Sequence, residues 1–170
     1  MPDPVVLAAP IPCRVGITRW EPGPLTDALA ARLRRANLFA EVYYPLESGA
    51  EMDASIEFDV HRAYASAPTV GETALDVITL GMVSGSHPTR YRAILRGDLS
   101  LRVGERTLRK LEKTVRISCS VKYGSPIAAV RELADQGACE QLAARLVEEL
   151  ARDPAKLAAE IAAGPGASVP

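Results

Sequence analysis

Cysteine and histidine are scarce in this chain of 170 residues, which contains three cysteines and two histidines. A closed zinc site needs four clustered cysteine or histidine ligands, so the sequence predicts no metal site. It also contains no glycine-rich phosphate loop, and no serine, histidine or cysteine stands in a recognisable pairing of nucleophile and base. We therefore expect no catalytic residues and no cofactor.

Excess positive charge and long apolar runs are also missing. The formal net charge is −1, so no overall positive field favours a nucleic acid as partner. No apolar run approaches the roughly 20 residues of a membrane-spanning helix. The N-terminal stretch has no basic region, and Pro12 stands before Cys13 where a lipoprotein signal needs a small residue. We expect no export signal in the chain as written, which fits either a trimmed mature protein or a cytoplasmic protein with a loose leader.

The overall composition is that of an ordinary globular protein, with 48% hydrophobic and 24% charged residues. This length is enough for one domain with a sizeable core. We expect a flexible N-terminal segment over 1–13, a single α+β domain over 14–153, and a short helix with a disordered tail over 154–170.

Alternating apolar residues predict five strands, and helical spacing predicts the helices. The strands are expected over 14–20, 38–44, 54–61 and 91–103, with a last long strand after a turn at 104–106. A first helix is expected from Pro24 to Ala36, with Asn37 closing it in the left-handed conformation. A second helical region begins at Ser125-Pro126 and runs to Leu150, with a bend at 135–137.

Each predicted strand has one apolar and one polar face. Such strands need a cover on one side only, which the amphipathic helices supply. The order β-α-β-β-β-α therefore predicts a two-layer α+β sandwich with a mixed, mostly antiparallel sheet and helices on one face.

The polar face of this sheet carries complementary charges. We expect Glu57 and Asp59 on one strand to meet Arg92 or Arg96 on its neighbour, at about 0.2–1 kcal/mol per pair. Together with Arg116, these residues form a candidate ligand-binding face. The alternative is an ordinary solvated outer face.

The connection from Ala65 to Thr89 is too long for an ordinary hairpin loop. Its middle, Ala74–Val83, is apolar yet fits neither a strand nor a one-sided helix. This segment either folds back to cap the core or docks on a partner subunit or a lipid surface. We favour the docking role, and its expected contact residues are Leu75, Val77, Ile78, Leu80, Met82 and Val83.

Two cysteines, Cys119 and Cys139, are both expected to point into the core. They are either small buried apolar residues or the two halves of a disulfide. A disulfide requires Cα atoms within about 7 Å of each other.

Several segments in this order carry a likeness to known proteins: Val15–Trp20, Ala36–Phe39, Ala54–Val60, Thr79–Val83 and Tyr91–Leu101. From Cys13 to Arg152, the chain resembles small bacterial outer-membrane lipoproteins and periplasmic accessory domains, akin to the amino-terminal domain of TolB and the curli-secretion lipoprotein. It departs from them in having no lipobox before Cys13. The resemblance implies a non-catalytic envelope accessory protein that supports assembly, export or transport.

The same resemblance implies a periplasmic location, associated with the outer membrane. The implied partners are an envelope protein complex, a second copy of the chain, or the membrane surface. Two alternatives remain open: a module that binds a ligand on the charged sheet face, and an intracellular oligomeric structural component.

Overall fold

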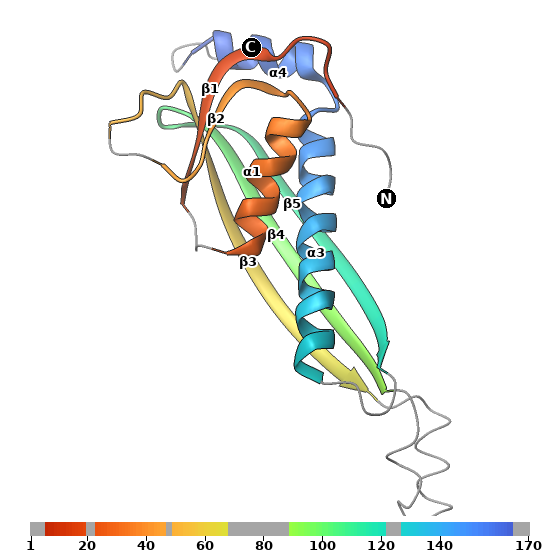
Figure 1. Ribbon diagram of the computed structural model, residues 1–170. Coiled ribbons are helices and arrows are strands. Elements are labelled where there is room, and N and C mark those ends of the chain that lie inside the picture. The colour runs from red at the N-terminus through yellow and green to blue at the C-terminus, as the bar shows by residue number, and fades with distance from the viewer. Residues whose placement is uncertain (1–5, 20–22, 47–48, 68–88, 122–126, 165–170) are drawn as a thin grey trace, which may run out of the picture.

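The computed structural model describes residues 6–19, 23–46, 49–67, 89–121 and 127–164. It contains strands β1 (Ile11–Arg19), β2 (Phe39–Tyr43), β3 (Ala54–Ala67), β4 (Thr89–Val103) and β5 (Arg106–Val121). The helices are α1 (Pro24–Arg35), α3 (Ile127–Leu150) and α4 (Pro154–Ala162). All five strands form one sheet in the order β2-β1-β3-β4-β5 (Figure 1).

The sheet is mixed, as predicted. β1 is parallel to both β2 and β3, whereas β3, β4 and β5 form long antiparallel pairs. β1 reaches only residues 54–57 of β3, but β3 pairs with β4 as far as Ala67. The three long strands therefore continue past β1 and β2 as a ribbon (Figure 1). We call residues 58–67 of β3, the part of β4 that pairs with them and the part of β5 that pairs with that part of β4 the distal ribbon. Its tip is the distal end.

The helices cover one face of the sheet, which confirms the predicted two-layer sandwich. α1 and α3 lie side by side, and α3 packs on β4 and β5. Apolar side chains between the layers form one core, which removes their surface from water. Its largest fully buried members include Ile17, Leu29, Leu33, Leu38, Ile56, Leu95, Leu99, Leu101, Leu142, Leu146 and Leu157.

Helix α1 forms and ends as its sequence predicts. Pro24 occupies the first turn, and charged residues complement the helix dipole, with Asp27 in the first turn and arginines in the last. Asn37 has φ 52°, so it adopts the predicted left-handed conformation after the helix. The side chain of Arg34 then donates to the backbone oxygens of Val42 and Tyr44 at 3.0 and 2.9 Å, tying α1 to β2.

Helix α3 continues without a break through residues 135–137, where the sequence predicts a bend. Gly137 lies within the helix and faces the sheet, and a Cβ there would stand at an ordinary contact distance of 3.4 Å from Ile117 Cδ1. Gly97 on β4 is in a tighter position. A Cβ at Gly97 would lie 2.9 Å from Leu142 Cδ2 and 3.1 Å from Phe58 Cε2. The absence of a side chain at Gly97 therefore lets Leu142 of α3 pack close to the sheet.

The ordered domain is longer at both ends than the predicted range 14–153. β1 begins at Ile11, and Ile11 and Cys13 are buried, so the last residues of the predicted flexible segment belong to the sheet. At the other end, α4 buries Leu157 in the shared core. Asp153 caps α4 by accepting from the Lys156 backbone N–H at 3.0 Å. These contacts correct both predicted boundaries.

Candidate interaction surfaces

The six apolar residues predicted to dock, Leu75, Val77, Ile78, Leu80, Met82 and Val83, lie outside the described residues, and their role stays a prediction. The structure does place the two ends of their segment. Ala67 at the end of β3 pairs with Arg90 near the start of β4. The described residues on either side of the segment, Ala67 and Thr89, therefore lie at the distal end.

The predicted ligand face lies on the outer side of the sheet, opposite the helices. Glu57, however, pairs with neither of its expected partners, Arg92 and Arg96. The register places it opposite Ser100, and the diagonal neighbour Arg102 reaches it with 2.8 Å between Nη1 and Oε1. The predicted partners of Glu57 were wrong, because alternation identifies a strand's face but not its register.

A row of three carboxylates crosses this outer face. Asp59 lies opposite Asp98, which lies opposite Glu112. Arg96 compensates for the like charges, with its Nη2 2.9 Å from Glu112 Oε2 and its Nε 3.7 Å from Asp98 Oδ2. His61 Nε2 lies 3.7 Å from the same oxygen of Asp98. Arg96, Asp98 and Glu112 therefore form an ion-pair network at a solvated surface.

Arg92 and Arg116 are exposed on the same face, nearer to the distal end. Arg92 lies opposite Ser118 in the register, and Arg116 lies opposite Ile94. The five predicted residues thus share a face but do not converge. Asp59 is in the carboxylate row, Arg96 contacts two carboxylates of that row, and Glu57 pairs with Arg102. Arg92 and Arg116 lie apart from these groups.

A cleft of about 460 Å³ opens on the helix side of β3, near the first residue of α1, beyond which α1 no longer covers the sheet. It was not predicted, because it depends on how far β3 extends past α1, and no local pattern reports that. Its mixed lining comprises Pro24, Arg62, Ala128, Arg131, Glu132, Asp135, Gln136 and Cys139. Cations, carboxylates and small apolar groups alternate here, so the cleft has no single charge preference.

All three cysteines are free thiols in the structure, so of the two alternatives for Cys119 and Cys139 it has the one without a disulfide. Cys139 is buried on α3 beside the cleft, and burial raises the pKa of its thiol. Burial likewise raises the pKa of Cys13 to about 11, with Asp53 adding to the effect. Protonated thiols are poor nucleophiles and metal ligands, so both residues act as small core side chains.

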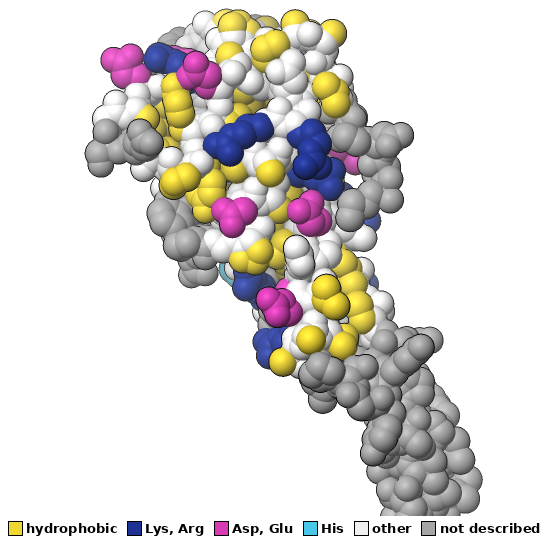
Figure 2. Space-filling view, in the orientation of Figure 1, with side chains coloured by type: hydrophobic (Ala, Val, Ile, Leu, Met, Phe, Trp, Pro, Cys, Tyr) yellow, Lys and Arg dark blue, Asp and Glu magenta, His cyan; other side chains and the backbone are white. Residues whose placement is uncertain are grey.

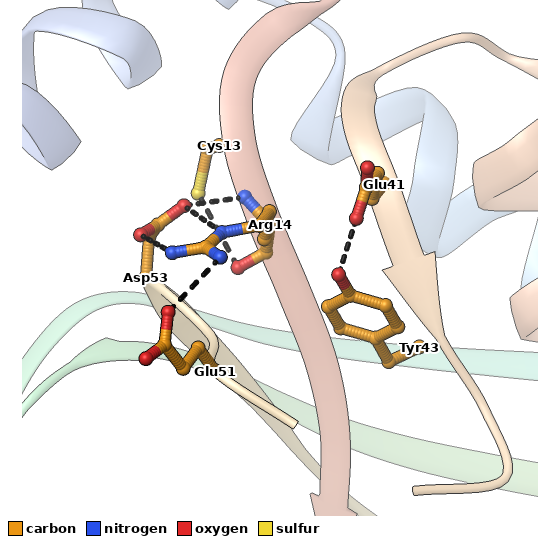
Figure 3. Close-up of polar contacts among 6 residues, drawn as sticks. All are labelled: Cys13, Arg14, Glu41, Tyr43, Glu51 and Asp53. Carbon is orange, nitrogen blue, oxygen red and sulfur yellow. Dashed lines mark hydrogen bonds and ion pairs between the residues drawn. The ribbon is translucent and has the colours of Figure 1, made fainter. Parts of the chain in front are cut away.

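A further ion-pair cluster holds the loop before β3 against β1 (Figure 3). The Arg14 backbone N–H donates to Asp53 Oδ2 at 2.8 Å, and Arg14 Nη2 lies 3.2 Å from Asp53 Oδ1. Glu51 approaches the same guanidinium, with 3.5 Å between Oε2 and Nη1. Hydrogen bonds from Arg14, together with its charge, lower the pKa of Asp53, and the hydrogen bond to Asp53 with the charge of that carboxylate raises the pKa of Arg14. This cluster was not predicted, because Arg14 is far from Glu51 and Asp53 in the sequence.

Exposed apolar surface lies along the first half of α3. Leu133 is 68% exposed, one of two large hydrophobic residues so exposed in the described part of the chain. Ala128 and Ala129, one turn earlier, are exposed as well. Figure 2 shows hydrophobic side chains gathered on this face toward the distal end.

The described ranges contain neither a metal-binding cluster nor a membrane-spanning helix. No group of three or more histidine, cysteine, aspartate or glutamate side chains there has the arrangement to hold a metal ion. Among the helices described, none combines the length and the apolar character needed to cross a membrane.

The fold has counterparts among solved bacterial proteins, although no protein-family model and no curated protein matches the sequence. The rare lipoprotein B from Shewanella oneidensis superposes with a TM-score of 0.54 at 14% identity, covering 85% of this chain and 98% of the other. A minor lipoprotein from Acinetobacter baumannii gives 0.55 at 7% identity, covering 82% and 93%. An uncharacterized lipoprotein B from Nitrosomonas europaea gives 0.54 at 14% identity, covering 91% and 94%. The chain therefore has the fold of small bacterial lipoproteins, as the resemblance implied.

Proposed function

We propose that this chain is a non-catalytic accessory protein of the bacterial envelope, on the periplasmic side of the outer membrane. It supports assembly, export or transport of an envelope component by contacting another protein or the membrane surface with its distal end. The fold that this chain shares with bacterial lipoproteins supports the proposed location in the envelope.

One observation carries the choice of the distal end. The ribbon of β3, β4 and β5 projects beyond the rest of the sheet, and the apolar segment Ala74–Val83 is joined to its tip. The exposed Leu133 on α3 adds apolar surface on the way to that tip. Each apolar side chain removed from water contributes about 1.5–3 kcal/mol, so a few of them suffice for docking.

The experiment compares two double variants of the tagged chain in its native host. Ile78→Asp with Leu80→Asp places two charges on the apolar segment, and Thr73→Asp with Thr79→Asp adds the same charge without removing an apolar side chain. We expect the first variant to lose association with the isolated envelope fraction by at least about tenfold, while the second keeps it.

Protein-free phospholipid vesicles separate the two kinds of partner. Binding of the wild-type chain to vesicles, lost in the first variant, identifies the membrane surface. Binding to the envelope fraction alone identifies a protein partner. Equal envelope association of both double variants would contradict the proposal.

A further inference from the structure

The apolar alternation on the inner face of β3 ends at a charged residue. Ile56 and Phe58 on this face are buried in the core, and Arg62 lies on the same face, opposite the buried Leu95. Arg62 is nevertheless exposed, because it lines the cleft of about 460 Å³ beside Pro24, the first residue of α1. The helix side of the sheet therefore presents a cation to this cleft.

The other wall of the cleft is one face of α3. Ala128, Glu132, Gln136 and Cys139 line it at intervals of three or four residues, as neighbours on one helix face do. Glu132 is exposed, whereas Cys139 is buried. Burial raises the pKa of the Cys139 thiol, and the positive charge of Arg62 opposes that rise. The strand and the helix thus bring Arg62 and Glu132 to the same cleft.

These two residues differ from the charged pair nearby. Where α1 and α3 pack together, Arg32 Nη2 and Glu140 Oε2 lie 3.2 Å apart. Arg62 and Glu132, by contrast, form no ion pair with each other or with any other residue in the described ranges. A molecule that binds between them needs an anionic group for Arg62 and a cationic group for Glu132.

We propose that the cleft binds a small zwitterion, an amino acid or a short peptide with free termini, whose carboxylate binds Arg62 and whose ammonium group binds Glu132. An arginine donates two parallel hydrogen bonds to a carboxylate, which makes this contact specific. The volume of the cleft is within the range of roughly 300–1,000 Å³ that small-ligand sites have. Pro24, Ala128 and Cys139 supply the apolar part of the lining, so we expect small side chains on the ligand.

Titration of the purified full chain with trialanine, followed by NMR of the isotopically labelled protein, tests this site. We expect a dissociation constant of about 1 mM, shifts confined to residues of the cleft, and weaker binding in added salt. N-acetyl-trialanine and trialanine amide each lack one terminal charge and should bind at least about fivefold more weakly. Free alanine separates the two sources of the ligand: affinity equal to that of trialanine identifies an amino-acid site, and lower affinity a peptide site.

Charge reversal tests the two contacts directly. Arg62→Glu and Glu132→Arg should each weaken trialanine binding at least about tenfold, because like charges then meet. The double variant should regain binding, because the ligand then binds in the opposite direction. Arg35→Glu is the matched control, since Arg35 is exposed at the other end of α1, and it should bind trialanine as the wild type does.

Four results would each overturn the proposal: no binding of trialanine to the wild type, equal binding of the capped peptides, no recovery in the double variant, or loss of binding in Arg35→Glu. Circular dichroism of every variant confirms that folded chains are compared. The capped peptides test the wild type itself, so that arm does not depend on how any variant folds. The envelope association of the apolar segment is measured separately, so either proposal can fail alone.

Discussion

Leu142 lies at the centre of the contact between α3 and the sheet. Its side chain is fully buried, and its Cδ2 occupies the space that a Cβ on Gly97 would need. Leu133 stands nine residues earlier in the same helix and is 68% exposed. The same residue type therefore has opposite environments in one helix, which allows a matched comparison.

Leu142→Ala should lower the free energy of unfolding by about 2–5 kcal/mol, because it leaves a cavity between the layers. Leu133→Ala should change it by no more than about 0.5 kcal/mol. Urea denaturation of the two variants measures both values. Similar losses in the two variants would mean that α3 does not pack with the face described.

Asp53 provides a test against pH. Arg14 lowers the pKa of this carboxyl below its ordinary value of 3.8, so the carboxylate stabilises the fold at pH above that value. The stabilisation is lost as the pH falls through the lower folded-state pKa. Asp53→Asn should therefore be less stable than the wild type at pH 7, and the difference should shrink below about pH 3.8.

Urea denaturation at pH 7 and at pH 2.5 checks the Asp53 prediction, with pH 2.5 chosen as roughly one unit below the ordinary pKa. Added salt should reduce the difference at pH 7, since the pair is partly exposed. Glu51→Gln is the matched control and should have a smaller effect, because Glu51 meets Arg14 only at 3.5 Å. A stability difference that does not vary with pH would show that the Arg14–Asp53 ion pair is not the cause.

At the scale of elements, local sequence patterns predicted the strands and the helix ends, because these depend mainly on neighbouring residues. The alternation in Ala54–Val60 identified β3 and its buried face, and Asn37 marked the end of α1. Partners on neighbouring strands could not be predicted from local sequence, so Glu57 was assigned to the wrong arginine. A bend was predicted at residues 135–137, but α3 runs through them as one helix.

The candidate sites were less predictable than the elements. The outer face of the sheet followed from alternation, but its ion-pair rows depend on register. The cleft beside Arg62 depends on where α1 begins relative to the end of β3, which is a property of the assembled fold. The Arg14 cluster joins residues that only the pairing of β1 with β3 brings together.

Helix α4 gives the prediction at this scale. Leu157 is 1% exposed, and Glu160 holds Arg109 of β5, so the helix is part of the domain. Leu157→Ala should cost about 2–5 kcal/mol of unfolding free energy, and the exposed neighbour Lys156→Ala no more than about 0.5 kcal/mol. Thermal and urea unfolding measure both. If Leu157→Ala leaves the free energy of unfolding unchanged, α4 does not pack as part of the domain.

For the whole molecule, the two ends differ in construction. At one end α1, α3 and α4 cover the sheet and close the core. At the other, the ribbon of β3, β4 and β5 continues past β1 and β2 with the first part of α3 beside it, and β3 ends at its tip before the apolar segment in sequence. We therefore assign stability to the first end and contact with partners to the second.

The free energy of unfolding of the variant with Ile78→Asp and Leu80→Asp tests this division most directly. If the segment serves contact, the variant should unfold within about 1 kcal/mol of the wild type while its envelope association is lost. A loss of several kcal/mol, or failure to fold, would mean that two charges had entered the core, and would contradict the account.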